Sequence, residues 1–211
     1  TSGDKTRAYR LLYEAVHLEP QYVFTHYLLA YLYFSERNYP LAKAMADKAL
    51  EIDVKFFPAR RLLGDIYFEE GRFENAVAEY NAALSSDKTD PVLLNSAALA
   101  YMNLERYDEA VRLLQEAAAL NPGNVNLLYS LACLYRDSGR LREAMSAYRA
   151  VIAKDTAFPN VHNDLAGVYK NLGRPDLAVA EYREEMAIVS EKLALNPQDP
   201  FLLADMAAAC N

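Results

Sequence analysis

Several residue types are scarce in this chain of 211 residues, and each shortage narrows the class of protein. The chain has no tryptophan, seven glycines and two cysteines, Cys133 and Cys210. With few glycines and 53% hydrophobic residues, the composition favours a packed helical protein over a disordered one. The two cysteines are far apart, so we expect free thiols. No apolar run reaches the roughly 18 residues of a membrane-spanning helix, so direct membrane insertion is not expected.

Positive charge is also in short supply. The 22 Lys and Arg residues are outnumbered by 29 Asp and Glu residues, which gives a formal net charge of -7. Because phosphate groups are bound by clustered basic side chains, a nucleic-acid partner or a broad anionic-membrane surface is not expected. The compartment stays open: a cytoplasmic location is favoured, while an export signal or anchor outside this stretch would also be compatible.

The signatures of catalysis and of cofactor binding are missing as well. The three histidines, His17, His26 and His162, are scattered, and no cysteine or carboxylate cluster has metal-ligand spacing. Cys133 and His162 could approach each other as a thiol-imidazole pair, but the sequence offers no oxyanion hole or third orienting group. Glycine-rich phosphate loops are absent too. We therefore predict no metal, no cofactor and no enzymatic activity.

What the chain does contain is a repeat with a step of 34 residues. At this step one column holds tyrosines and two columns hold small residues. The tyrosines are Tyr33, Tyr67, Tyr101, Tyr135 and Tyr169; the small residues are Ala8, Ala42, Ala76, Ala110, Ala144 and Ala178, and Ala30, Gly64, Ala98, Ala132, Ala166 and Ala207. A small residue lets two helix axes approach while a large neighbour fills the space beside it. The columns therefore predict interdigitated helix pairs.

These columns resemble the tetratricopeptide repeat (TPR), as do the leucines Leu29, Leu63, Leu131 and Leu165 and the repeat ends Asn121-Pro122 and Asn196-Pro197. The resemblance covers essentially the whole chain. It implies an all-α fold, an α-solenoid in which antiparallel helix pairs form a right-handed superhelix. One departure is the first aromatic position of the family, often Trp, where this chain has His26, Arg60, Leu94, Leu128 and His162.

The period predicts one solenoid domain over residues 1–211. It consists of a half-unit at 1–22, full units at 23–56, 57–90, 91–124, 125–158 and 159–199, and a half-unit at 200–211. Prolines Pro58, Pro91, Pro159 and Pro200 are expected at helix starts, where proline costs no hydrogen bond. The fifth full unit has seven extra residues, which predicts a longer second helix from Pro175 to Leu195.

The resemblance implies a binding site on the concave wall formed by the first helix of each unit. The contact residues expected on this wall are Phe24, Tyr27, Tyr31, Phe34, Arg61, Asp65, Phe68, Asn95, Leu99, Met102, Asn126, Tyr129 and Asn163. The aromatic residues suit a partner's apolar side chains, or alternatively pack against the preceding helix or a missing N-terminal repeat. The asparagines suit the backbone of an extended peptide, or alternatively cap helices. Arg61 is spaced to pair with Asp65 on its own helix.

Two further patterns bear on the kind of partner. Some family members hold a partner's C-terminal carboxylate with Lys, Asn and Arg side chains, and this chain lacks that pattern, so a chaperone-tail receptor is not expected. The second is a basic column just after the inter-helix turns, Arg72, Arg106, Arg140 and Arg174. Because acidic residues follow each of these arginines, we interpret the column as a solvated turn edge.

The sequence thus favours a noncatalytic protein–protein interaction module that binds a peptide or a partner helix and acts as a scaffold or adaptor. One alternative is a substrate-recruiting arm of a larger enzyme such as a glycosyltransferase. Another is self-association through open solenoid ends, with Leu203, Met206 and Cys210 stacking on Ala8, Leu12 and Ala15 of another copy.

Overall fold

The computed structural model describes residues 2–85 and 89–200, and over these residues the chain is helical with no strand. Its helices are α1 (Ser2–Leu18), α2 (Val23–Ser35), α3 (Tyr39–Ile52), α4 (Phe57–Glu69), α5 (Phe73–Leu84), α6 (Pro91–Asn103), α7 (Tyr107–Leu120), α8 (Val125–Asp137), α9 (Leu141–Lys154), α10 (Val161–Asn171) and α11 (Pro175–Leu195). The all-α class predicted from the sequence is confirmed.

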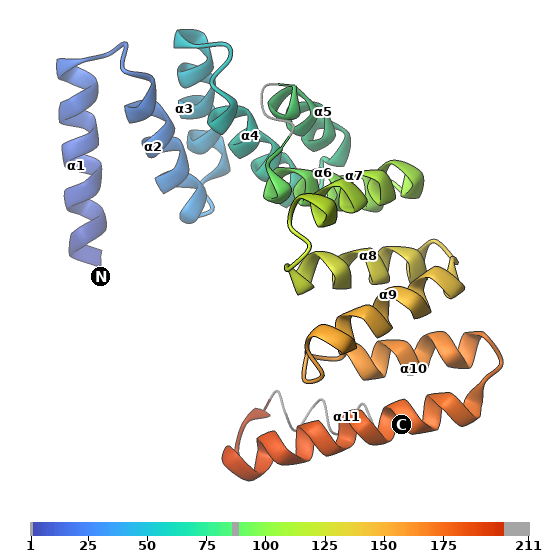
Figure 1. Ribbon diagram of the computed structural model, residues 1–211. Helices are drawn as coiled ribbons and strands as arrows, with labels where there is room; N and C mark the ends of the chain where they lie inside the picture. Colours follow the sequence, from blue (N-terminus) through green and yellow to red (C-terminus); the bar gives the residue numbers. More distant parts are fainter. Residues whose placement is uncertain (1, 86–88, 201–211) are drawn as a thin grey trace. The chain divides into compact units, whose positions relative to one another are not determined.

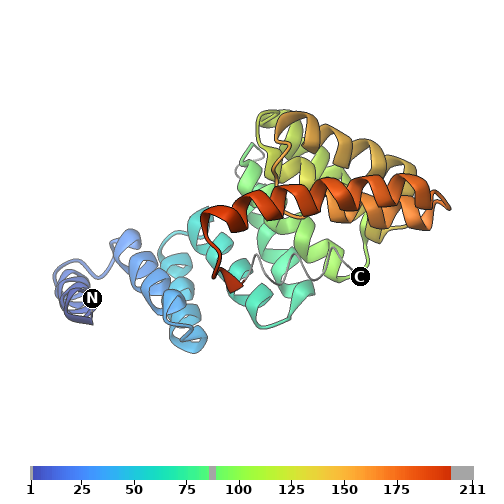
Figure 2. The same ribbon diagram turned by 90° about the horizontal axis from the view of Figure 1, so that it is seen from below.

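The chain divides into two compact units, Thr1–Leu113 (unit 1) and Leu114–Asn211 (unit 2), and the division falls inside α7. In unit 1, α2 packs on α3 and α4 packs on α5; in unit 2, α8 packs on α9 and α10 on α11. Figure 1 shows these as pairs of neighbouring antiparallel helices, and the orange and red pair of α10 and α11 also lies side by side in Figure 2. Helix pairs are thus the building block, while the division into one domain with the stated repeat bounds stays a prediction.

The columns of small residues lie in the core. From Ala42 to Ala178 in one column and from Ala30 to Ala166 in the other, every member is buried. Gly64 is the single departure from alanine in the described part of the second column, and a Cβ atom there would lie 2.5 Å from Cε1 of Tyr80. The large ring therefore occupies the space that the missing methyl group leaves.

The turn inside each helix pair contains one residue with a positive φ angle. These residues recur every 34 positions: Arg37 (58°), Gly71 (72°), Glu105 (58°), Gly139 (74°) and Gly173 (70°). The next residue donates its N–H to the carbonyl five positions back, as Arg72 does to Tyr67 at 2.8 Å. This is the left-handed C-terminal cap of a helix, which glycine adopts without strain and which Arg37 and Glu105 adopt at a cost.

The tyrosine column joins successive repeats by hydrogen bonds as well as by packing. For four of the five tyrosines, the side chain 20 positions earlier, on the preceding second helix, contacts the hydroxyl group. Asn81 donates to Tyr101 at 2.9 Å, Gln115 to Tyr135 at 2.8 Å and Arg149 to Tyr169 at 2.6 Å, and the hydroxyls of Tyr13 and Tyr33 lie 2.6 Å apart. Each bond satisfies a polar group at a helix–helix junction, which explains why tyrosine suits this column better than phenylalanine.

At the family's aromatic position, two polar side chains of this chain are held by hydrogen bonds. His162 Nε2 lies 3.3 Å from the carbonyl of Thr156, and its Nδ1 lies 2.7 Å from Glu181. Arg60 repeats this arrangement with the carbonyl of Val54 and with Glu79, both at 3.2 Å. Each side chain is therefore held between the loop six residues back and the second helix of its own pair.

His26 is the incomplete version of that arrangement. Its Nε2 lies 2.9 Å from the carbonyl of Pro20, but Nδ1 is buried and has no hydrogen-bond partner within the described residues. The position that holds a glutamate in the other two cases is Met45 here. A buried polar atom left in this way costs stability, so this site is the weakest of the three.

At the C-terminal end the structure agrees with one expectation and corrects another. Helix α11 has the predicted bounds, Pro175–Leu195, and is seven residues longer than α9. Helix α10, however, begins at Val161, so Pro159 lies in a turn before it and not at its start. Asn160 takes a left-handed conformation, with φ 59°, which delays the helix. The expected half-unit 200–211 lies outside the described residues except for Pro200.

Candidate peptide-binding surface

Two adjoining pockets lie on the faces of α2, α4 and α6 in unit 1. The first, here called the Tyr31 pocket, has a volume of about 280 Å³ and is lined by Tyr27, Tyr31, Phe57, Pro58, Arg61, Leu62 and Asp65. The second, here called the Phe68 pocket, has a similar volume, about 280 Å³, and is lined by Phe34, Arg61, Asp65, Phe68, Glu69, Tyr80, Ser96 and Leu99. Arg61 and Asp65 belong to both pockets, so the pockets are neighbours along α4.

The pockets bring together seven of the thirteen residues expected from the sequence. Three of these, Tyr27, Tyr31 and Phe34, come from α2. Tyr31 is 55% exposed, whereas Tyr27 is half-buried and its ring centroid lies 5.6 Å from that of Phe56. Phe24 is 48% exposed and stacks edge-on against Phe56 at 5.0 Å. Phe24 and Tyr27 therefore contact Phe56, the residue that precedes α4.

Tyr80 reaches this surface from the second helix of its pair. Its ring passes over Gly64, and its hydroxyl donates to Oδ1 of Asp65 at 2.8 Å. Burial raises the pKa of both groups, and for Tyr80 the neighbouring Asp65 carboxylate raises the pKa further. Both groups lie on the Phe68 pocket, so the pocket has a carboxylate that is poorly solvated.

Arg61 forms a different ion pair from the one its spacing suggested. Its Nη1 lies 3.5 Å from Oδ2 of Asp90, which precedes α6, while Asp65 accepts from Tyr80. Asp90 is also the N-cap of α6 and accepts from the backbone N–H groups of Val92 and Leu93. Three-dimensional proximity thus outweighs the helical i, i+4 spacing, and Arg61 is partly neutralised by the residue that caps α6.

The three candidate residues on α6, Asn95, Leu99 and Met102, have different surroundings. Leu99 lines the Phe68 pocket, and Met102 is half-buried but lines neither pocket. Asn95 is half-buried as well, and its Oδ1 is buried without a hydrogen-bond partner in the described part of the chain. Since Asp90 caps α6, Asn95 is not a cap.

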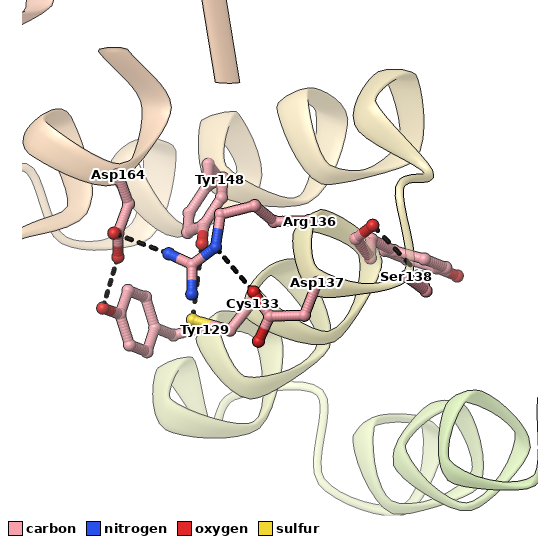
Figure 3. Close-up of polar contacts among 8 residues, drawn as sticks. Tyr129, Cys133, Arg136, Asp137, Ser138, Tyr148 and Asp164 are labelled. Atoms are coloured by element: carbon pink, nitrogen blue, oxygen red, sulfur yellow. Dashed lines mark hydrogen bonds and ion pairs between the residues drawn. The ribbon is translucent and has the colours of Figure 1, made fainter. Parts of the chain in front are cut away.

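In unit 2 the corresponding face is filled by a polar network (Figure 3). Asp164 of α10 accepts from the Tyr129 hydroxyl at 2.5 Å and from Nη1 of Arg136 at 2.7 Å, both on α8. Arg136 also pairs with Asp137 at 2.9 Å. Burial alone would lower the pKa of Arg136, but the hydrogen bond that its guanidinium donates to Asp137 and the neighbouring acidic groups raise the pKa above its ordinary value. Tyr129, Arg136 and Asp164 are therefore bonded to one another.

Cys133 belongs to the same face and is a free thiol. The Tyr148 hydroxyl donates to its Sγ at 3.3 Å, and burial raises the pKa of the Cys133 thiol. His162 is bonded to Glu181 and to a carbonyl group, so the thiol-imidazole pair that we considered is not formed. A thiol with a raised pKa is a weak nucleophile.

Asn126 and Asn163 were the other candidates in unit 2. Asn126 is exposed, and its backbone N–H donates to Oδ1 of Asn124, which is the N-cap of α8. Asn163 is half-buried inside α10, whose N-cap position is Asn160. Neither residue is a cap, which leaves both carboxamides in the role of candidate contacts.

The basic column behaves as a turn edge. Arg106 pairs with Glu109 at 2.5 Å, Arg72 with Glu70 at 3.6 Å and Arg174 with Asp176 at 3.9 Å. Within the described residues no helix is long and apolar enough to cross a bilayer, and no group of three potential metal ligands occurs. Of the two surfaces in the self-association hypothesis, Ala8, Leu12 and Ala15 are half-buried on α1, and the other lies outside the described residues.

The arrangement of helix pairs has counterparts in known proteins. The model described as "Tetratricopeptide repeat" matches residues 25–55, 95–159 and 129–191, and the model described as "TPR repeat" matches residues 64–105. The chain belongs to the tetratricopeptide repeat family. No curated protein sequence matches this TPR chain significantly.

Solved structures of other TPR proteins have the same fold. YrrB, described as a TPR protein with an unusual peptide-binding site, superposes with a TM-score of 0.74 at 21% identity over 92% of this chain and 96% of that one. A MamA protein superposes with a TM-score of 0.76 at 21% identity, over 82% and 93% of the two chains. At these identities the likeness shows the fold alone.

Sequence reasoning missed four residues of the TPR chain that shape the two faces. Tyr80 was missed because it comes from a second helix, although Gly64 in an alanine column signals a bulky neighbour. Ser96 and Asp164 were missed as well. They are 68 residues apart, which is two repeat lengths, so they occupy equivalent positions, and that spacing was the available signal. Asp90 was missed because its contact with Arg61 joins residues 29 positions apart.

Proposed function

We propose that this TPR chain is a noncatalytic interaction module that holds an extended peptide or a partner helix on the α2–α4–α6 face of unit 1. The observation that carries the proposal is the pair of adjoining pockets, which are lined by exposed and half-exposed aromatic side chains of the helices. Concave sites with apolar walls and a few convergent polar groups are the usual form of a ligand site. That YrrB is described as having a peptide-binding site is consistent with this role.

The energy of binding would come mainly from the aromatic side chains. Tyr31 is 55% exposed and Phe57 is 40% exposed, and both line the Tyr31 pocket. Covering such rings contributes more than polar contacts at the rim, because apolar area leaves water. The Tyr27 hydroxyl, whose pKa is raised chiefly by burial, stays protonated and can donate to a peptide carbonyl.

The test is selection of a display library of random 12-residue peptides on the immobilised chain. We expect peptides with apolar side chains to be enriched, and the combined substitutions Tyr31→Ala and Phe57→Ala to weaken a selected peptide by at least tenfold. Both rings are partly exposed, so the helices should keep their circular dichroism. Val92→Ala is the control, because Val92 is 55% exposed on α6 and lines neither pocket. If selection yields nothing above background, or if the pocket variant binds as well as the wild type, the proposal fails.

A further inference from the structure

The Phe68 pocket combines aromatic walls with carboxylates, and this chemistry specifies an occupant. We propose that the pocket takes a basic side chain, lysine or arginine, from the bound peptide, while an apolar side chain nearby on the peptide fills the Tyr31 pocket. This inference rests on the proposed function. It names the chemical class of the partner that the function leaves open.

Aromatic rings from three helices form the walls of the pocket. Phe34 comes from α2, Phe68 from α4 and Tyr80 from α5. Phe68 is held edge-on against Phe73 at 5.4 Å, and Tyr80 is held by its bond to Asp65. A cation over an aromatic face is stabilised by the ring's quadrupole, and unit 1 already contains such contacts: Nζ of Lys43 and Cζ of Arg72 lie 5.3 and 4.6 Å from the Tyr67 ring centroid.

The charges on the pocket are mainly negative. Asp65 and Glu69 are one helical turn apart on α4, so both carboxylates lie on the same side of that helix. Arg61 is the single basic residue among those lining the pocket, and its guanidinium already faces Asp90. Glu69 receives a weak bond from the Tyr39 hydroxyl at 3.4 Å. The balance of charge therefore favours a cation and disfavours an acidic side chain or a C-terminal carboxylate.

Asp65 is the carboxylate to which a bound cation would donate a hydrogen bond. It accepts one hydrogen bond, from Tyr80, and burial raises its pKa despite that bond and the neighbouring Arg61. An apolar occupant would desolvate the carboxylate further without compensation, and that cost opposes such a ligand. An ammonium or guanidinium group in the pocket would supply a charge-assisted hydrogen bond instead.

The experiment uses the same display library of random 12-residue peptides on the full chain and on two variants, Asp65→Asn and Glu69→Gln. We expect one position with an excess of Lys and Arg among peptides selected by the wild type, and a reduced excess with each variant. Asparagine still accepts from Tyr80, and Glu69 is exposed, so neither change should disturb folding. Glu116→Gln is the matched control, because it removes one exposed carboxylate from α7 and lies on neither pocket.

A selected peptide then provides the quantitative test. Replacing its basic residue by norleucine, or Asp65 by Asn, should each weaken binding by about tenfold, and the two changes together should cost less than their product. The affinity of the basic peptide should fall as pH drops and Asp65 becomes protonated, and it should fall with added salt. The norleucine peptide should show neither trend.

The outcomes separate this inference from the proposed function. If peptides are selected and depend on Tyr31 but show no excess of Lys or Arg, the cation inference is overturned and the interaction module stands. An excess that Asp65→Asn and Glu69→Gln leave intact also overturns it. If no peptide is selected at all, both proposals fail together.

Discussion

The corresponding faces of the two units use one helical framework in opposite ways. In unit 1, Tyr80 rises beside Gly64 and donates to Asp65, and the short Ser96 leaves the Phe68 pocket open. In unit 2, Tyr148 occupies the equivalent position and donates to Cys133. There Asp164, equivalent to Ser96, reaches Tyr129 and Arg136.

The two faces differ in how fully their carboxylates are hydrogen-bonded. Unit 2 satisfies its carboxylate with a tyrosine and an arginine of the neighbouring helix, so the network contributes to stability. Unit 1 leaves a desolvated carboxylate with one partner, which is a stability cost that a ligand can offset. Sites that are destabilised in this way are typical of functional surfaces.

The largest effect is expected at the glycine that admits Tyr80. In Gly64→Ala the added Cβ would lie 2.5 Å from Cε1 and 2.6 Å from Cδ1 of the ring, so the ring must shift and the Phe68 pocket must change shape. Overpacking of this kind costs about 1–3 kcal/mol. Urea unfolding followed by circular dichroism measures it.

Gly167→Ala is the control in unit 2. It lies in α10, and its new Cβ would meet nothing within 4 Å. Alanine should stabilise that helix by about 0.5–1 kcal/mol. Equal destabilisation by both substitutions would show that close approach of the Tyr80 ring is not what makes Gly64 necessary.

The next effect concerns the closed face. Asp164→Ser gives unit 2 the serine that unit 1 has at Ser96. It leaves Tyr129 and Arg136 without their shared acceptor, which should lower the free energy of unfolding by about 2 kcal/mol. Asp137→Ser removes the other carboxylate from the same arginine, and its pair is more exposed, with side chains 32% and 38% exposed. That change should cost less than about 0.5 kcal/mol. Similar losses from the two variants would contradict a special role for Asp164.

A smaller, pH-dependent effect is expected at Asp65. Its pKa in the folded chain is raised above the ordinary 3.8, so the folded state holds this proton more tightly than the unfolded state does. The stability from this group is fully present below pH 3.8 and is lost as pH rises through the raised pKa. Asp65→Asn should therefore gain stability relative to the wild type as pH rises from acid to neutral. Urea unfolding at a series of pH values checks the sign, and a constant difference across the series would refute it.

The smallest effect compares the turns. Two turns of unit 1 place Arg37 and Glu105 at a left-handed position, whereas unit 2 has Gly139 and Gly173 there. Each of Arg37→Gly and Glu105→Gly should stabilise by about 0.5 kcal/mol, because relief of strain exceeds the added freedom of the unfolded chain. Gly139→Ala, whose Cβ would meet nothing within 4 Å, should destabilise by a similar amount. Thermal unfolding detects both directions, and glycine substitutions that lower the melting temperature would contradict the argument.

The 34-residue spacing of small residues and tyrosines was sufficient to predict the helix pairs, the buried columns and the bounds of α11, because a helix buries residues by short-range periodicity. The tertiary structure decided what the exposed faces do. Whether Arg61 meets Asp65 or Asp90, and whether Tyr80 and Ser96 open a pocket or Tyr148 and Asp164 close a face, depends on side-chain reach between helices. Such contacts join positions 15 to 35 residues apart in the pairs seen here, and they depend on which side chains stand at the two positions.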